Sequence, residues 1–80
     1  MSYIFEVYYK PPHDSRREAT LTKQVTHLGG RLSFREDRDE QGIGAVCLTY
    51  EFDELGLAEV AADSLRQQGE HVEGPVDYGP

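Results

Sequence analysis

The chain has one cysteine, no tryptophan and no long hydrophobic run, and each shortage excludes a class of protein. Cys47 alone cannot form an intramolecular disulfide, and nothing near it supplies the other ligands of a structural zinc site. No stretch approaches the roughly 20 apolar residues of a membrane span, and the N-terminus lacks a basic segment followed by an apolar run. We therefore expect a cytoplasmic protein that folds without disulfides, metal or membrane.

Basic residues are scarce in the second half of the chain. The net charge is −7, from 8 lysines and arginines against 15 acids. Seven of the basic residues lie in residues 1–38, which carry a net charge of +2, whereas residues 39–80 carry −9. Since nucleic-acid affinity depends on neutralising phosphates, this acidic half argues against nucleic acid as a partner. A basic protein, a cationic ligand or a second copy of the chain suits the charge better, and a merely solvated acidic surface is the simplest alternative.

Length and composition indicate a single small domain. A chain of 80 residues with 38% hydrophobic and 29% charged residues forms one globular unit, which we place at residues 1–80. Its two halves repeat a pattern forty positions apart: a strand-like segment at Tyr3–Tyr9 recurs at Ile43–Phe52, and each is followed by a helix-like segment ending in glycine. The repeat predicts two βαβ units in one fold.

The first unit contains a strand, a helix and a second strand. Alternating aromatic and apolar residues predict the strand Tyr3–Tyr9. Ser15 and Glu18 have the spacing of a capping box, so a helix is expected to begin at Ser15 and to end at Gly29. A second strand then places Leu32 and Phe34 on one face, opposite its arginines.

The second unit follows a polar segment at 39–42 that predicts a hairpin loop. In the strand that follows, Val46, Leu48, Tyr50 and Phe52 share one face. Asp53 is the expected N-cap of the second helix, whose buried side should contain Leu57, Val60, Ala61 and Leu65. Residues 70–76 complete the unit as a short edge strand that contains Pro75.

This order of elements resembles the ferredoxin-like βαββαβ superfold over the whole chain. The resemblance implies an α+β two-layer sandwich, with a four-stranded antiparallel sheet in the order 4-1-3-2 and both helices on one face. The order is also similar to that of ACT-type regulatory domains, and Leu28-Gly29-Gly30-Arg31-Leu32 looks like their junction between helix and strand. Their usual glycine in the turn after the first strand is absent here, so amino-acid binding is a weak expectation.

The open face of such a sheet is the expected functional surface. If the apolar faces meet the helices, the open face carries Arg31, Ser33 and Arg35 on the second strand and small residues such as Cys47 at its centre. The residues expected to bind a ligand or form an interface are Tyr8, Glu6, Arg35, Cys47, His71 and Glu73. Cys47 is expected to be a small buried residue more than a nucleophile, because no histidine or lysine is near it in sequence.

No catalytic or metal-binding constellation stands out. His71 with Glu73, and His13 with Asp14, lack the helical spacing and the further ligands of known metal sites, so no metal and no cofactor is expected. The leading hypothesis is a non-enzymatic binding or regulatory module that forms a homodimer through its open sheet face. The alternative is a small dimeric enzyme, similar to ferredoxin-like monooxygenases or isomerases, in which Tyr8, His71, Glu6 and Glu73 act as acids or bases. A basic protein or a small metabolite is a further possible partner.

Overall fold

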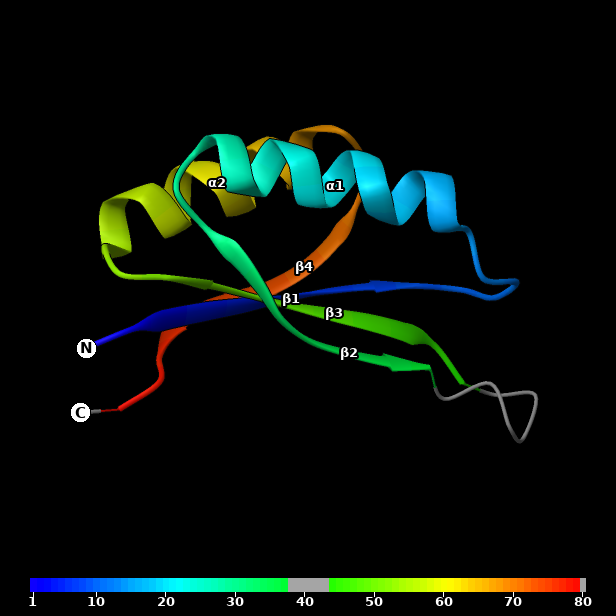
Figure 1. Ribbon diagram of the computed structural model, residues 1–80, viewed down its shortest axis with the longest axis horizontal. Coiled ribbons are helices and arrows are strands. Elements are labelled where there is room, and N and C mark those ends of the chain that lie inside the picture. The colour runs from blue at the N-terminus through cyan, green and yellow to red at the C-terminus, as the bar shows by residue number, and fades with distance from the viewer. Residues whose placement is uncertain (38–43, 80) are drawn as a thin grey trace.

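Six elements follow one another along the chain in the computed structural model, which describes residues 1–37 and 44–79 (Figure 1). They are β1 (Tyr3–Tyr9), α1 (Ser15–His27), β2 (Arg31–Asp37), β3 (Val46–Phe52), α2 (Leu55–Gln67) and β4 (His71–Asp77). The sheet has the order β2-β3-β1-β4 with every neighbouring pair antiparallel, and both helices cover one of its faces. The fold is ferredoxin-like, which confirms the predicted fold class and strand order. The predicted hairpin loop at 39–42 lies outside the described residues.

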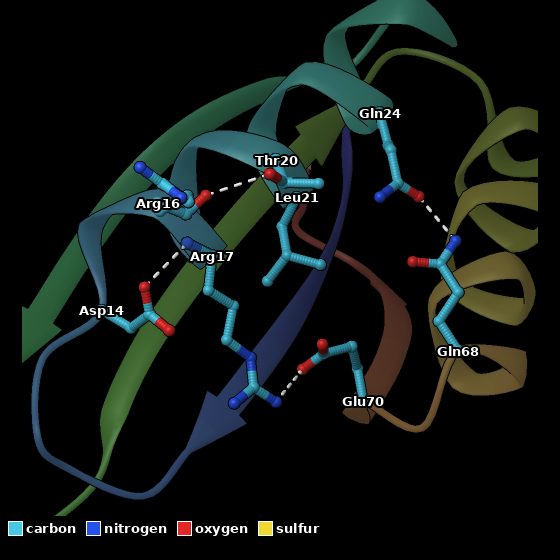
Figure 2. A pocket seen from close by; sticks show the side chains of 8 residues that line it. All are labelled: Asp14, Arg16, Arg17, Thr20, Leu21, Gln24, Gln68 and Glu70. Carbon is cyan, nitrogen blue, oxygen red and sulfur yellow. Dashed lines mark hydrogen bonds and ion pairs between the residues drawn. The ribbon is translucent and has the colours of Figure 1, made fainter.

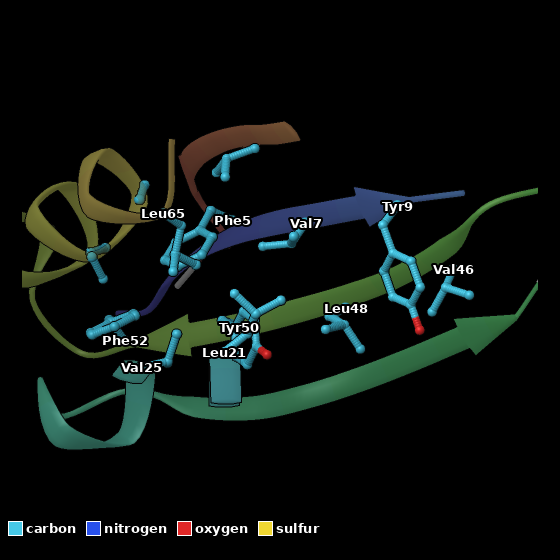
Figure 3. Close-up of a cluster of buried hydrophobic side chains, with 14 residues drawn as sticks. Phe5, Val7, Tyr9, Leu21, Val25, Val46, Leu48, Tyr50, Phe52 and Leu65 are labelled. Carbon is cyan, nitrogen blue, oxygen red and sulfur yellow. The ribbon is translucent and has the colours of Figure 1, made fainter. Parts of the chain in front are cut away.

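The core lies between the sheet and the two helices (Figure 3). Strands β1 and β3 form the centre of the sheet, and the alternate residues that they turn toward the helices are buried, as their period-2 pattern predicts. These residues are Phe5, Val7, Tyr9, Val46, Leu48, Tyr50 and Phe52. Phe5 contacts both aromatic rings of β3, with ring centroids 5.7 Å from Tyr50 and 5.8 Å from Phe52. The two central strands therefore share one aromatic cluster in the core.

The start of α1 differs from the capping-box prediction. Asp14 is the N-cap residue, and its Oδ1 accepts the Arg17 backbone N–H at 3.0 Å, while Ser15 is already helical. Glu18 does not reach back to the helix start, because its carboxylate faces Arg35 of β2 and Tyr9 of β1. The helix thus begins where expected, but Glu18 joins the helix to the sheet.

Helix α2 packs closely on the sheet through alanines. Ala58, Ala61, Ala62 and Leu65 are its buried residues, whereas Leu57 and Val60 are exposed, so that part of the predicted face was wrong. Asp53 was also wrong as the N-cap: Glu54 occupies that position without a side-chain cap, and Asp53 accepts a hydrogen bond from Arg31 at 3.2 Å. Among the described residues, no helix has the length and apolar character needed to cross a bilayer.

Candidate functional site

The open face of the sheet, opposite the helices, brings together most of the residues predicted to form a site. Antiparallel partners lie on the same face, so the strand register arranges the open-face residues in three rows across the sheet. In the order β2, β3, β1, β4, the first row is Arg31, Glu51, Ile4 and Val76; the middle row is Phe34, Thr49, Glu6 and Glu73; the last row is Glu36, Cys47, Tyr8 and His71.

A β-bulge in β2 changes which residues of that strand face outward. Leu32 pairs with Tyr50 and Phe34 pairs with the adjacent Thr49, so Ser33 is an extra residue in the strand. Beyond this bulge the alternation is reversed, and Phe34 lies on the open face with 57% of its surface exposed. The prediction that Phe34 packs toward the helices was wrong for this reason.

The opposite edge strand, β4, contains a bulge with the same effect. Glu73 pairs with Glu6 and Val76 pairs with Ile4, so two residues, Gly74 and Pro75, oppose one residue of β1. Gly74 has φ +103°, and a Cβ there would lie 3.0 Å from the Ile4 carbonyl oxygen, so a side chain does not fit. Val76 is thereby turned onto the open face, where 55% of it is exposed. Each edge of the sheet therefore presents one apolar side chain outward.

Polar groups at the centre of the open face contact one another. The Cys47 thiol donates to the Glu6 carboxylate with an Sγ to Oε2 distance of 3.7 Å. Burial and the negative charge of Glu6 raise the pKa of Cys47. Burial, together with Cys47 and Glu6, also raises the pKa of the Tyr8 hydroxyl. Both groups are therefore protonated donors near neutral pH. Cys47 is only 5% exposed, which agrees with its expected role as a small buried residue.

His71 and Glu73 extend this cluster to the sheet edge. The His71 Nε2 and Glu73 Oε2 atoms are 3.0 Å apart, and the His71 ring lies edge-on to Tyr8 with centroids 5.8 Å apart. Both side chains of the pair are well exposed. Tyr8, Glu6, Cys47, His71 and Glu73 thus form one continuous polar cluster, which we call the open-face cluster.

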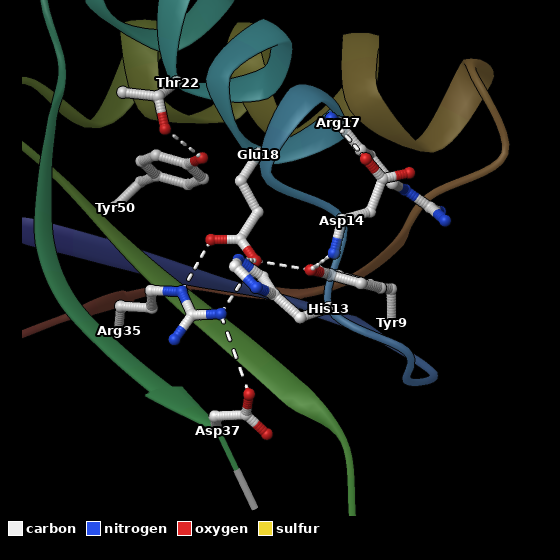
Figure 4. Close-up of polar contacts among 9 residues, drawn as sticks. All are labelled: Tyr9, His13, Asp14, Arg17, Glu18, Thr22, Arg35, Asp37 and Tyr50. Carbon is white, nitrogen blue, oxygen red and sulfur yellow. Dashed lines mark hydrogen bonds and ion pairs between the residues drawn. The ribbon is translucent and has the colours of Figure 1, made fainter. Parts of the chain in front are cut away.

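Arg35 is the one predicted site residue that lies elsewhere. Beyond the β2 bulge it pairs with Leu48 and faces the helices, so its predicted place on the open face was wrong. There it forms two hydrogen bonds to Glu18, from Nε at 2.6 Å and from a terminal nitrogen at 3.0 Å (Figure 4). The Tyr9 hydroxyl donates to the same carboxylate, and the His13 ring lies 3.5 Å from it. Sequence spacing offered no signal for this network, because its members come from three separate elements.

Glu18 is the centre of that network, and its ionisation is linked to folding. The hydrogen bonds from Arg35, followed by the one from Tyr9, lower the pKa of Glu18. A carboxyl group with a lower pKa in the folded chain stabilises the fold above its unfolded pKa of about 4.3, and this contribution is lost as the pH falls through the folded pKa.

We expect Glu18→Gln to lower the free energy of unfolding by about 1 kcal/mol near pH 7, because a charged acceptor is replaced by a neutral one. The difference from the wild type should shrink as the pH falls through the lowered pKa of folded Glu18, because the wild-type carboxyl is then protonated in both states. Urea unfolding followed by circular dichroism from acid to neutral pH measures this. Glu59→Gln, at an exposed position of α2, is the matched control. An equal loss at every pH would contradict the linkage.

A groove lies on the helix side, between the first half of α1 and the end of α2 (Figure 2). It measures about 300 Å³, and all but one of its lining side chains are polar, several of them already with partners. Arg17 forms an ion pair with Glu70 at 2.8 Å and lies over the Tyr9 ring, and the Gln68 amide donates to Gln24 at 2.6 Å. These contacts join the two helices and the start of β4, so a structural role explains the groove.

The described part of the chain contains no group of three histidine, cysteine or acidic side chains placed to hold a metal ion.

Comparison with known proteins identifies no family: no protein-family model matches the chain, and no curated protein matches it. The open sheet face and its cluster are therefore the best candidate functional surface, on geometry alone.

Proposed function

We propose that this protein is a non-enzymatic binding or regulatory module that self-associates through the open face of its sheet. The observation that carries the proposal is the pair of edge bulges, which turn Phe34 and Val76 outward on opposite edges of that face. Bulges at both edges spoil the regular ladder that edge-to-edge pairing needs, while the apolar side chains favour packing against the face. Small residues at the centre, Cys47 and Thr49, leave room for a second layer.

The size of the face suits a weak dimer. Four strands of seven residues, spaced at about 4.8 Å with about 3.3 Å per residue, present roughly 400 Å² in projection. Two such faces in contact bury somewhat more than twice that area once side-chain relief is included, which is near the lower limit of about 1,200 Å² for specific complexes. An interface of this size is typical of weak and transient complexes.

Phe34→Ser is expected to weaken this self-association at least tenfold, because a large exposed aromatic side chain at an interface is a typical hot spot. Leu55→Ser is the matched control, since Leu55 is 42% exposed but belongs to α2 in the other layer. Light scattering behind size exclusion, over about 1 to 500 μM, compares the variants. A wild-type chain that stays monomeric throughout this range, or a Leu55 variant that dissociates equally, would refute the proposal.

The effect of salt concentration on affinity distinguishes self-association from binding to a basic protein. Among the described residues, the rows of the open face contain four glutamates and one arginine, so two copies repel each other at long range. Raising the salt from about 50 mM to about 500 mM should therefore strengthen the dimer by screening this repulsion. A complex with a basic protein would weaken under the same change.

A second candidate, an acid–base enzyme, is favoured by the open-face cluster itself. The Glu73 carboxylate orients the His71 ring, which lies beside the Tyr8 ring, so a candidate base is held next to a phenolic hydroxyl. Burial raises the pKa of Tyr8, so this hydroxyl acts as a hydrogen-bond donor and His71 is the candidate for proton transfer. We rank it second because the face specifies no substrate chemistry. A cytoplasmic location remains a prediction from the sequence.

A further inference from the structure

The three rows of the open face restrict how two copies can meet. A symmetric face-to-face dimer has a twofold axis lying between the sheets. When the two sheets pack with their strands aligned, this axis runs close to the strand direction or nearly perpendicular to it. An axis along the strands places β2 opposite β4 and β3 opposite β1 of the second copy, with each row opposite itself. An axis across the strands places each strand opposite itself and exchanges the first and last rows. The two arrangements bring different side chains together.

An axis across the strands brings like charges together. The middle row then lies on itself, so Glu6 faces Glu6 and Glu73 faces Glu73 of the second copy. Like charges held together in a dry interface are strongly unfavourable, because water no longer screens them. Glu6 lies on a central strand, where packing sheets exclude water most completely. This arrangement is therefore disfavoured by the register alone.

An axis along the strands separates the carboxylates. Every glutamate in the rows then faces a residue that is not acidic. The facing pairs are Glu51 with Ile4, Glu6 with Thr49, Glu73 with Phe34 and Glu36 with His71, each with the second residue contributed by the other copy. Thr49 offers a hydroxyl to Glu6, and Glu36 faces a histidine ring in place of a carboxylate. This arrangement therefore avoids the contacts between like charges that the other axis imposes.

We infer that the dimer axis runs along the strands, so that the β2 edge of one copy covers the β4 edge of the other. This inference rests on the proposed self-association. The open-face cluster is then a composite site: His71 and Glu73 of one copy are covered by Phe34 and Glu36 of the other. Aligned sheets are rotated by about 30° relative to each other, which shifts the edge residues by roughly 5 Å, about one strand spacing, so these residues remain neighbours across the interface.

Site-directed crosslinking distinguishes the two axes. Single variants Glu36→Cys, His71→Cys and Arg31→Cys are made in a Cys47→Ala background whose dimerisation is first confirmed by light scattering. Because packed sheets are about 10 Å apart, beyond the reach of a disulfide, a bismaleimide with a span of about 10 Å is used. Mixing the Glu36 and His71 variants should give crosslinked dimers, whereas mixing the Glu36 and Arg31 variants should give few.

A reversed result, with crosslinks between the Glu36 and Arg31 variants, would contradict the proposed axis and leave the self-association intact. Dimers without either crosslink would place the interface elsewhere, and a monomeric wild type would refute the proposed function itself.

A second experiment changes the charges of the facing pair Glu36 and His71 in the chain that keeps Cys47, and measures the dissociation constant of the dimer. His71→Asp should weaken the dimer about tenfold, because it places a carboxylate opposite Glu36. Adding Glu36→Lys should restore the affinity, and failure to restore it would contradict the pairing.

Discussion

Leu48→Ala is expected to lower the free energy of unfolding by about 3 to 5 kcal/mol, the largest single effect that we predict for this chain. Leu48 lies at the middle of β3, pairs with Val7 and Arg35 on the two sides, and is 0% exposed. Removing its side chain loses hydrophobic burial and leaves a cavity that a sheet cannot close, because its backbone is held by both neighbouring strands.

The size of this loss is large against the whole stability of the domain. A chain of 80 residues is expected to be stable by about 4 to 12 kcal/mol, so the variant should be close to unfolding at 37 °C. Thermal and urea unfolding at low protein concentration measure the change without a contribution from self-association. Leu55→Ala is the matched control and should change stability by less than about 0.5 kcal/mol, because Leu55 is 42% exposed. Equal losses in both variants would show that the core is misassigned.

Gly30→Ala is expected to destabilise the fold by about 1 to 3 kcal/mol through overpacking. Gly30 lies between α1 and β2, and its Cα faces the core. A Cβ at this position would lie 2.5 Å from Cε1 of Phe52 and 2.7 Å from Cγ1 of Val25, both far inside normal contact distance. The Phe52 ring is fully buried and cannot move aside without disturbing the aromatic cluster with Phe5.

A double-mutant cycle tests that explanation. Phe52→Leu removes the ring atoms that collide with the new methyl group, so the combined variant should lose less stability than the sum of the two single changes. Gly56→Ala is the control, because a Cβ there meets nothing within 4 Å and α2 should gain slightly from a better helix former. Strict additivity of Gly30→Ala and Phe52→Leu would mean that the collision is not the cause.

Local patterns predicted the central part of this structure correctly. Side chains of β1 and β3 alternate between the helix side and the open face, so their period of two specified both which residues enter the core and which reach the open face. Tyr8, Glu6 and Cys47 were placed correctly for that reason. Glycines after each helix marked the helix ends, and the order of elements left few topologies to consider.

The edges of the sheet were decided only by the tertiary structure. The apolar pair Leu32 and Phe34 reads as one face of a strand, yet Ser33 is absorbed into a bulge and the two residues face opposite ways. The bulge depends on how β2 pairs with β3, which lies fifteen or more residues further along the chain. The alternation of apolar and polar residues within β2 therefore cannot predict it. The same bulge turns the Arg35 side chain away from the open face and toward the helices, where it contacts Glu18.

The amino-acid sequence by itself determined the elements, their order and the inward faces of the two central strands, because those depend on periodicity and on turn residues that act locally. Tertiary structure decided the register of the edge strands, the alanine face of α2 and the partners of Glu18. These features depend on long-range pairing and close packing, where one extra residue in a strand reverses every side chain beyond it. The candidate interface, with Phe34 and Val76 turned outward, exists because of that reversal.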